Sequence, residues 1–357
     1  MKHHKTLRAA ALAVLAALIL SLAACGAPEN ADPTSQPAPS SSSDSEDSAP
    51  PAAGGAGSSA ADGTAQDDGG LFQGSMVLLP FSPTALLPLP NGNALLADQT
   101  NRSVYCLETD GDLTLYAGDI TEAVDVNGRP LGGYADGPDT ESLFALPWAI
   151  APFLDGYAVS DAENNALRLI QDGQVSTLNV TGTGGTPLNY PTGLAAGEDG
   201  CLYFSDTGNG RVCRVTTDGR MAPVAKGLSE PMGLSWHDGV LYIAETGANR
   251  ILQLSDGKLT VLAGQGADGC EDGKADQALF CAPRGVVAAE GCVYVADTAN
   301  SAVRRIKDGV VDTLIRHEVS DEQNPLPASP TGLSLWEGDL YVCDTFTGAL
   351  LKLPVEE

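Results

Sequence analysis

The segment PTGLAAGEDGCLYFSDTGNGRVCRVTTDG, residues 191–219, decides how this chain folds. Similar segments begin at Pro231, with PMGLSWHDGVLYIAETGANRILQLSDG, and at Pro283, with PRGVVAAEGCVYVADTANSAVRRIKDG. In each segment, short apolar runs alternate with turns that are rich in Asp, Gly, Thr and Asn. Apolar runs bounded by turn residues predict β-strands, and their recurrence along a chain predicts a repeat architecture.

Six copies of the unit align on a proline that opens the first apolar run. In every copy the second run ends in an acid that follows this proline by 14 or 15 residues. The six prolines are Pro83, Pro147, Pro191, Pro231, Pro283 and Pro330, and the six acids are Asp98, Asp161, Asp206, Glu245, Asp297 and Asp344. A third run and, after an Asp-Gly turn, a fourth run complete the unit. The pattern therefore predicts six units of four antiparallel strands.

The predicted strands are apolar on both faces, as in LYFS, LYIA and VYVA, which is typical of sheets covered on both sides. Six sheets packed radially around an axis meet that need, whereas an open stack of sheets leaves two end faces bare. The predicted fold class is therefore all-β, a six-bladed β-propeller of four-stranded antiparallel blades.

The two ends of the repeat region predict how the ring closes. Repeat six ends after its third run, at ALLKLPVEE, and the unassigned apolar segment MVLLPF, residues 76–81, precedes repeat one. We expect this N-terminal segment to supply the missing outer strand of the last blade and to protect its edge. The alternative is a frayed start to the domain.

The repeat resembles the NHL repeat, which is found in six-bladed propellers. PTGLAAGEDGCLYFSDTGNGRVCRV is similar to it in the Pro-x-Gly opening, in the Asp after the second strand, and in the Asn and Arg of the next turn. The resemblance covers nearly all of residues 76–357. Repeats one and two are looser, because PTAL and PWAI lack the glycine and neither repeat places Arg five residues after the acid.

The first 24 residues have the features of an export signal. A basic start, MKHHKTLR, precedes the apolar run AAALAVLAALILSLAA, and the segment ends in LAAC at Cys25. This ending resembles the lipobox of bacterial lipoproteins. The resemblance implies that Cys25 carries a lipid and holds the protein on the extracytoplasmic face of the cell membrane, with the lipid anchor as the only membrane contact. An ordinary secretory signal is the alternative.

Residues 25–75 are rich in Ala, Ser, Gly, Pro and Asp and predict a disordered stalk before the folded head at 76–357. The chain has a formal net charge of −27. The signal contributes +3 and the stalk −8, which leaves −22 for the head. An acidic head argues against nucleic acid and against adhesion to anionic lipids. It indicates solubility, with cationic ligands as a weaker possibility.

The residue after each repeat proline opens the innermost strand, at the mouth of the central channel. The resemblance extends to the related calcium-dependent lactonases. It implies that in those enzymes Glu, Asn or Asp side chains at this position converge on a metal. The residues here are Thr84, Trp148, Thr192, Met232, Arg284 and Thr331. A hard cation needs several oxygen ligands, and Arg284 would repel it. We therefore predict a ligand-binding mouth without a metal, and no catalytic residues.

Other polar residues favour structural roles. The six recurring acids precede tight turns, so we expect them to accept hydrogen bonds from turn amides, with Arg211 and Arg250 pairing locally. His237 and His317, the only histidines after the signal, lie in no metal-binding spacing and are interpreted as surface residues.

Two long links between repeats, ADGPDTESLFALP at 135–147 and EDGKADQALFCAP at 271–283, leave two alternatives open. Either Phe144 and Phe280 cap the core beside solvated acids, or the links bind a partner. Calcium in GADGCEDGKAD, residues 266–276, is the one possible cofactor, although the regular loop pattern is missing. Cys270 and Cys281 bracket the second link and are the best disulfide candidate.

These features favour a tethered, monomeric binding or scaffold propeller that recognises a protein, a peptide or a small anionic ligand on its channel face. Trp148, Met232 and Arg284 would supply aromatic, apolar and cationic contacts, unless they simply plug the channel. The alternative is a lactonase- or lyase-like enzyme with non-standard metal ligands. A third interpretation is assembly of envelope complexes through the outer rims.

Overall fold

The computed structural model describes residues 71–72, 75–121, 124, 128, 130–182, 185–289, 291–317 and 327–355, all of which lie in the compact unit Thr64–Glu357. The predicted export signal, the lipidated Cys25 and nearly all of the predicted stalk lie outside the described residues. They stay predictions.

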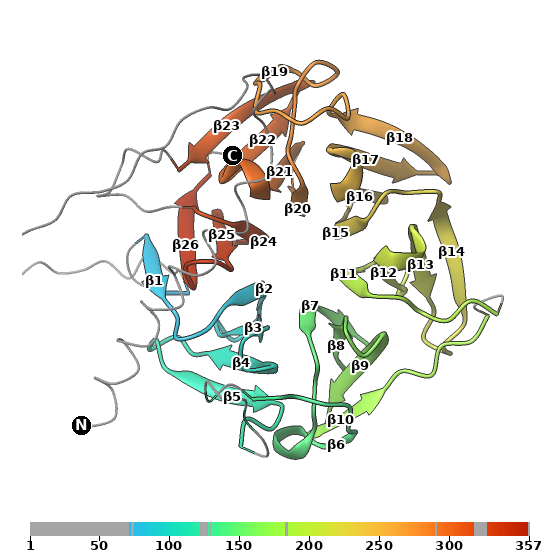
Figure 1. Cartoon of the computed structure of the whole chain (residues 1–357), viewed down its shortest axis with the longest axis vertical. Helices are drawn as coiled ribbons and strands as arrows, with labels where there is room; N and C mark the ends of the chain where they lie inside the picture. The colour runs from blue at the N-terminus through green and yellow to red at the C-terminus, as the bar shows by residue number, and fades with distance from the viewer. Residues whose placement is uncertain are drawn as a thin grey trace, which may run out of the picture. The chain divides into compact units, whose positions relative to one another are not determined.

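Six antiparallel sheets form the blades of a ring, as predicted (Figure 1). Blade 1 contains β2 (Pro83–Pro88), β3 (Ala94–Asp98), β4 (Ser103–Leu107) and β5 (Leu113–Ala117). Blade 3 contains β11 (Pro191–Ala196), β12 (Leu202–Asp206), β13 (Arg211–Val215) and β14 (Met221–Lys226). Blade 4 contains β15 (Pro231–His237), β16 (Val240–Glu245), β17 (Arg250–Ser255) and β18 (Lys258–Ala263).

Two blades have a fifth strand that the repeat pattern did not predict. Blade 2 contains β7 (Pro147–Phe153), β8 (Gly156–Asp161), β9 (Ala166–Gln171) and β10 (Gln174–Thr177), with β6 (Gly137–Pro138) outermost. Blade 5 contains β20 (Pro283–Ala289), β21 (Cys292–Asp297), β22 (Ala302–Lys307) and β23 (Val310–Arg316), with β19 (Gly273–Lys274) outermost. Both extra strands come from the long links, so each link extends the sheet of the blade that follows it.

Blade 6 joins the two ends of the domain. It contains β24 (Pro330–Trp336), β25 (Asp339–Asp344), β26 (Ala349–Pro354) and β1 (Met76–Leu78). The outer strand β1 pairs antiparallel with β26, with Val77 opposite Leu350. The predicted closure by the segment MVLLPF is therefore confirmed.

The folded region begins before residue 76, which was the predicted boundary. Leu71 and Phe72 are buried, the backbone N–H of Leu71 donates to the Tyr341 hydroxyl at 2.9 Å, and the rings of Phe72 and Tyr341 lie 5.8 Å apart. These two apolar residues stand at the end of a polar, Gly-rich segment. The composition of that segment predicted a stalk, so the sequence did not indicate that they pack against the domain.

The Pro-x-Gly glycines allow neighbouring inner strands to approach closely. A Cβ atom on Gly193, Gly233 or Gly285 would lie 2.0–2.4 Å from a carbonyl oxygen of the next blade. A Cβ atom on Gly332 would lie 2.4 Å from the carbonyl oxygen of Thr84, where blade 6 meets blade 1. These contacts explain the glycine of the repeat, because any side chain would separate the blades.

A threonine after the repeated acid links each of four blades to the next. In each case the hydroxyl donates a 2.7 Å hydrogen bond to the carbonyl of the proline that opens the following blade. The pairs are Thr207 with Pro231, Thr246 with Pro283, Thr298 with Pro330, and Thr345 with Pro83. The Thr84 hydroxyl takes this role toward Pro147, at 3.2 Å.

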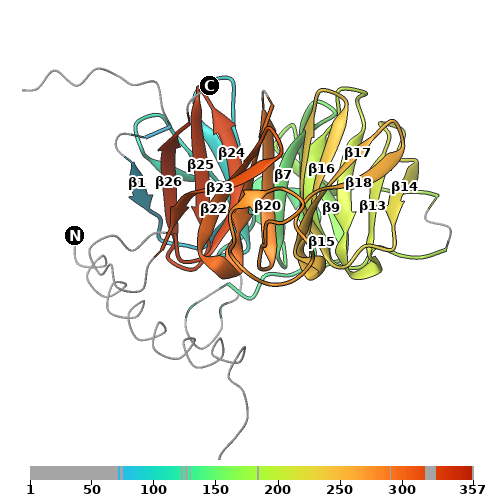
Figure 2. The ribbon, with the colours of Figure 1, turned by 90° about the horizontal axis from the view of Figure 1, so that it is seen from above.

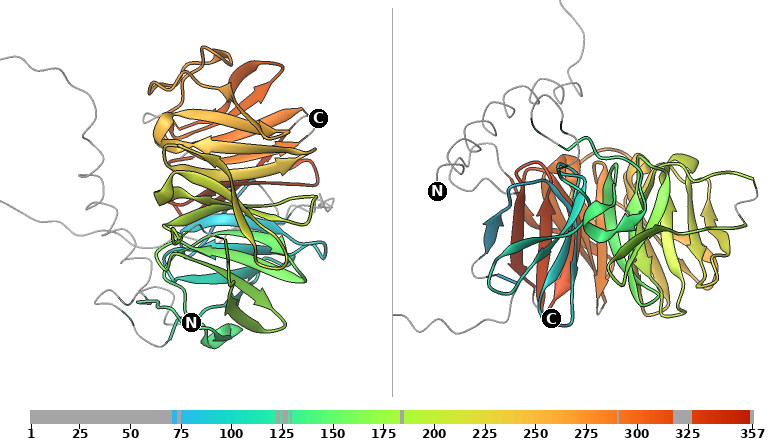
Figure 3. Two further views of the ribbon diagram at one scale, coloured as in Figure 1. Left: turned by 90° about the vertical axis from the view of Figure 1, so that its right-hand side faces the viewer. Right: turned by 90° about the horizontal axis from the view of Figure 1, so that it is seen from below.

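The strands run between two opposite faces of the propeller (Figures 2 and 3). One face, which we call the proline face, carries the turns between second and third strands and the links that lead to the repeat prolines. The other, the hairpin face, carries the turns between first and second strands and between third and fourth strands. The predicted channel mouth therefore belongs to the proline face.

Candidate functional site

The recurring acids of the proline face are scaffold residues, as the sequence predicted. Asp206 is fully buried; its Oδ1 accepts from the backbone N–H of Asn189 at 2.8 Å, and its Oδ2 accepts from Asn209 and from Nε of Arg211 at 2.7 Å. Glu245 accepts from the backbone N–H of Ser229 and pairs with Arg250. Each acid thus ties the link before its blade to the turn within the blade.

Blades 2 and 5 use a second arginine arrangement, which the sequence analysis missed. Arg304 is fully buried; its Nη1 lies 2.7 Å from Asp297, its Nη2 lies 2.6 Å from Asp272, and its guanidinium lies over the ring of Phe280. Arg168 in blade 2 binds the equivalent Asp161 and Asp136 and lies over Phe144. The signal was present, since both arginines follow their acid by seven residues.

The two long links therefore have a structural role. Phe144 and Phe280 are fully buried, as the capping alternative expected. The acids of residues 135–147 and 271–283 are half-exposed or exposed, as expected, and Asp136 and Asp272 also pair with the buried arginines. Asp272 binds Arg304 and accepts from the backbone N–H and hydroxyl of Thr313. Asp272 is one of four acids in residues 266–276, and a calcium ion in this segment stays a prediction.

The predicted disulfide between Cys270 and Cys281 is absent, and both residues are thiols. The Cys270 sulfur lies 3.6 Å from Nη1 of Arg304, which donates to it. The backbone N–H of Cys281 donates to Asp297. Each cysteine is thus held by the buried Arg304–Asp297 pair and its surroundings, and nearness in sequence did not predict this orientation.

Four of the six predicted mouth residues are buried. Thr84, Thr192, Met232 and Thr331 are at most 7% exposed. The hydroxyls of Thr84 and Thr331 donate to backbone carbonyls, and the hydroxyl of Thr192 shares a 2.7 Å hydrogen bond with Thr207. These threonines support the ring.

Trp148 and Arg284 are the predicted mouth residues that remain partly exposed. The Trp148 ring lies 6.5 Å from the ring of Tyr190, measured between centroids. Within the described part of the chain, Nε of Arg284 is buried and has no hydrogen-bond partner. The Nε atoms of Arg168 and Arg304 are likewise buried without a partner, but their Nη atoms are paired with acids.

Tyr190 lies beside Trp148 and within electrostatic range of Arg284. Burial raises the pKa of its hydroxyl, the negative charge of Glu163 raises it further, and the positive charge of Arg284 lowers it. Glu163 is itself paired with Arg102 at 3.2 Å. We call the three side chains of Trp148, Tyr190 and Arg284 the mouth cluster.

Tyr190 was missed by the sequence analysis because it precedes the repeat proline. Its φ is +54°, a conformation that a non-glycine residue seldom adopts. Its backbone N–H donates to Oδ1 of Asn165 in the preceding blade at 2.7 Å, which holds it in place. Glu230 and Ala282, which precede two other repeat prolines, also have a positive φ, at +46° each, so this conformation recurs in the repeat.

The described residues contain no group of three or more His, Cys, Asp or Glu side chains placed to hold a metal ion. The same part of the chain contains no helix that is long and apolar enough to cross a membrane. His237 lies in a hairpin-face turn, 3.6 Å from Asp238, and His317 follows β23. Neither histidine lies among the mouth residues.

Comparisons with known proteins agree with this architecture. Residues 191–337 match the family model of the teneurin NHL domain. The Arabidopsis thaliana protein Suppressor of quenching 1, chloroplastic, is 30% identical over 220 residues, which are 58% of this chain and 18% of that protein. The chain thus spans less than a fifth of the length of this relative.

Solved structures share the fold at low identity. An auxiliary nutrient binding protein from Bacteroides ovatus has a TM-score of 0.59 at 14% identity, covering 78% of this chain and 70% of that one. Virginiamycin B lyase from Staphylococcus aureus has a TM-score of 0.55 at 14% identity, covering 79% and 98%. These likenesses concern the fold alone. Together with the six blades and the repeat motif, the comparisons show that the folded part of this chain is an NHL-repeat β-propeller.

Proposed function

We propose that this protein is a surface-tethered extracytoplasmic binding protein whose proline face recognises an anionic ligand through the mouth cluster. The observation that carries the proposal is the position of Arg284, which opens the first strand of blade 5 at the channel mouth with its side chain partly exposed. Four other arginines, namely Arg168, Arg211, Arg250 and Arg304, are paired with the recurring acids. Arg284 is instead available to a carboxylate or phosphate group, which guanidinium binds in a two-pronged geometry.

The aromatic members favour a ligand that has a flat or apolar part beside its anionic group. Trp148 and Tyr190 combine large apolar surfaces with a polar atom, which is typical of recognition sites. The ring supports this role, because buried threonines and close glycine contacts fix the strands that carry the cluster. A rigid scaffold lowers the entropic cost of ordering side chains around a ligand.

A titration with small anions tests the proposal. We would measure binding of phenyl phosphate, benzoate and neutral benzamide to the full chain by calorimetry. We expect Arg284→Ala to weaken binding of the two anions by about 10- to 100-fold, the range for a hydrogen bond to a charged group. Arg316→Ala, which removes a surface arginine elsewhere, is the control. Equal binding of anions by the wild type and Arg284→Ala would overturn the proposal.

Metal analysis of the same protein distinguishes binding from the enzyme alternative. A tightly held cation at one per chain would support a lactonase- or lyase-like enzyme with non-standard ligands. Tethering is tested separately by labelling cells with radioactive palmitate. Incorporation that is lost in Cys25→Ser supports the lipid anchor, and incorporation that persists in this variant contradicts it.

A further inference from the structure

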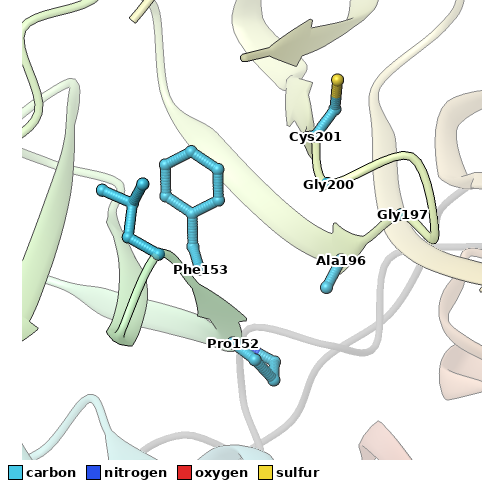
Figure 4. Close-up of a pocket in the computed structure, with 7 residues that line it drawn as sticks. Pro152, Phe153, Ala196, Gly197, Gly200 and Cys201 are labelled. Carbon is cyan, nitrogen blue, oxygen red and sulfur yellow. The ribbon is translucent and has the colours of Figure 1, made fainter. Parts of the chain in front are cut away.

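A second candidate site lies on the hairpin face, away from the mouth cluster. A cavity of about 190 Å³ opens between the first hairpins of blades 2 and 3 (Figure 4). Pro152, Phe153 and Leu154 line it from blade 2, and Ala196, Gly197 and Cys201 line it from blade 3. The lining side chains are apolar, and Phe153 and Cys201 form the buried part of the cavity.

Leu154 is the unusual residue of this cavity. Its side chain is 45% exposed, and its φ is +53°, a conformation that disfavours branched side chains. The equivalent turn positions of blades 4 and 6 are occupied by Asp238 and Glu337, at φ +48° and +50°. Blade 2 thus exposes an apolar side chain where those blades carry an acid.

The two turns around the cavity are acidic. Asp155 follows Leu154 directly, and Glu198 and Asp199 lie between the lining residues Gly197 and Gly200. Arg214 lies 3.9 Å from Asp199 and offsets one of the three charges. An occupant therefore needs an apolar group to fill the cavity and positive charge beside it.

We propose that this cavity is a docking site for a basic protein segment that inserts one apolar side chain between the two hairpins. A closed apolar cavity of about 150 Å³ is large enough to hold benzene, so a phenyl ring or a leucine side chain fits here. Lysine or arginine residues on either side of the inserted residue would face Asp155 and Glu198. Anionic lipid is disfavoured by the same carboxylates. The site does not depend on the proposed function of the mouth cluster.

The test uses three blocked pentapeptides as probes of the full chain. Acetyl-Lys-Lys-Phe-Lys-Lys-amide carries both required features, a Ser-centred analogue lacks the apolar side chain, and acetyl-Glu-Glu-Phe-Glu-Glu-amide reverses the charge. We expect calorimetry at low salt to show binding of the first peptide at least tenfold tighter than of the other two. Equal affinities for the basic and acidic peptides, or no binding of the basic peptide at millimolar concentration, would overturn the proposal.

The decisive variant is Leu154→Asp. Aspartate is native at the equivalent position, Asp238, so the turn is expected to fold normally. We expect this variant to lose at least tenfold in affinity for the basic Phe peptide. Leu131→Asp is the matched control, because Leu131 is a similarly exposed leucine, at 53%, on a link that leads to the proline face. An equal loss in both variants, or a loss in neither, would contradict the assignment to this cavity.

The charge requirement is tested by Glu198→Gln. We expect a loss of about twofold to fivefold, the range for an exposed ion pair, and a smaller loss at high salt. Glu337→Gln, in the equivalent turn of blade 6, should bind the peptide as the wild type does. If Glu198→Gln binds the basic Phe peptide as tightly as the wild type at low salt, the proposed role of the acidic turns is contradicted.

Discussion

The guanidinium of Arg304 lies 2.7 Å from the carboxylate of Asp297, and both side chains are fully buried. Burial raises the pKa of Asp297, while hydrogen bonds from Asn300 and Cys281 and the charge of Arg304 oppose that rise. The pair joins the link before blade 5 to the inside of the blade, because Arg304 also binds Asp272 of that link. Its removal should affect the whole blade.

We predict that Arg304→Met lowers the free energy of unfolding by about 3–5 kcal/mol, since it leaves the buried carboxylate of Asp297 without its cation. The neighbouring Arg305→Met serves as the control. Arg305 pairs with Asp312 at 2.9 Å on a partly exposed surface, so its loss should change the free energy of unfolding by about 1 kcal/mol or less. Urea unfolding followed by circular dichroism measures both. Similar losses in the two variants would contradict a special role for the buried pair.

A second prediction concerns Asp98, whose acid position lacks an arginine partner. Burial raises its pKa to about 7, although the backbone N–H groups of Thr100 and Asn101 donate to it. The ordinary pKa of 3.8 applies to the unfolded chain, so the folded state binds the proton more tightly. Its contribution to stability is therefore fully present below pH 3.8 and is lost as the pH rises through about 7.

Asp98→Asn should remove this pH dependence, because the amide stays neutral throughout. Relative to the wild type, the variant should gain up to roughly 1.4 kcal/mol of unfolding free energy per pH unit between about pH 4 and 7. Urea unfolding at pH 5, 6, 7 and 8 measures the difference. Asp110→Asn, at an exposed turn, is the control, and its unfolding free energy should depend on pH as that of the wild type does. A difference between Asp98→Asn and wild type that stays constant across this range would disprove the raised pKa.

The close approach of inner strands gives a third prediction. A Cβ atom on Gly233 would lie 2.4 Å from the carbonyl oxygen of Arg284, so Gly233→Ala must push two blades apart. We expect a loss of roughly 1–3 kcal/mol in unfolding free energy, as for other overpacked sites. Ala149 is the native residue at the equivalent place in blade 2, and Ala149→Gly should lose about 1 kcal/mol at most. Thermal unfolding measures both variants. An unchanged melting temperature in Gly233→Ala would show that the two blades can move apart at this point without loss of stability.

The fourth prediction concerns ring closure by β1. Val77 pairs with Leu350, and a proline there cannot donate to the ladder. We expect Val77→Pro to lower the free energy of unfolding by about 2–4 kcal/mol, from one lost hydrogen bond and poorer packing against β26. The neighbouring Leu78 is 65% exposed, so Leu78→Thr should change stability by about 0.5 kcal/mol or less. Scanning calorimetry distinguishes the two, and equal melting temperatures would argue that β1 is dispensable.

The fold was predictable from the sequence because the repeats carry the same residue types at their strand starts and turns. The proline, the glycine and the acid of repeats three to six all have visible structural causes, namely strand starts, close blade contacts and tied turns. Even the closing strand followed from counting runs, since repeat six lacked one. The boundary at residue 76 was less accurate, because Leu71 and Phe72 are two apolar residues within a polar segment.

The candidate site was less predictable, because it depends on side-chain placement. The threonines after the prolines were expected to line a mouth, yet neighbouring hydroxyls and carbonyls bind them inside the ring. Tyr190 lies just before the repeat proline, outside the positions that the repeat motif singled out. Similarly, no spacing rule shows that the Cys270 sulfur accepts a hydrogen bond from Arg304. Such contacts arise between blades, and a repeat pattern describes only single blades.

Because β1 and β26 are neighbours in blade 6 but stand at opposite ends of the domain, the order of synthesis matters for folding. Blades 1 to 5 can each form from four strands that are consecutive in the sequence while the chain is being synthesised. Blade 6 can be completed only after residues near 350 have been synthesised. Until then, the N-terminal strand has no partner and the sixth sheet has an open edge. A nascent chain released early would thus carry two unsatisfied strand edges, which are the features that protein quality control and aggregation both act on.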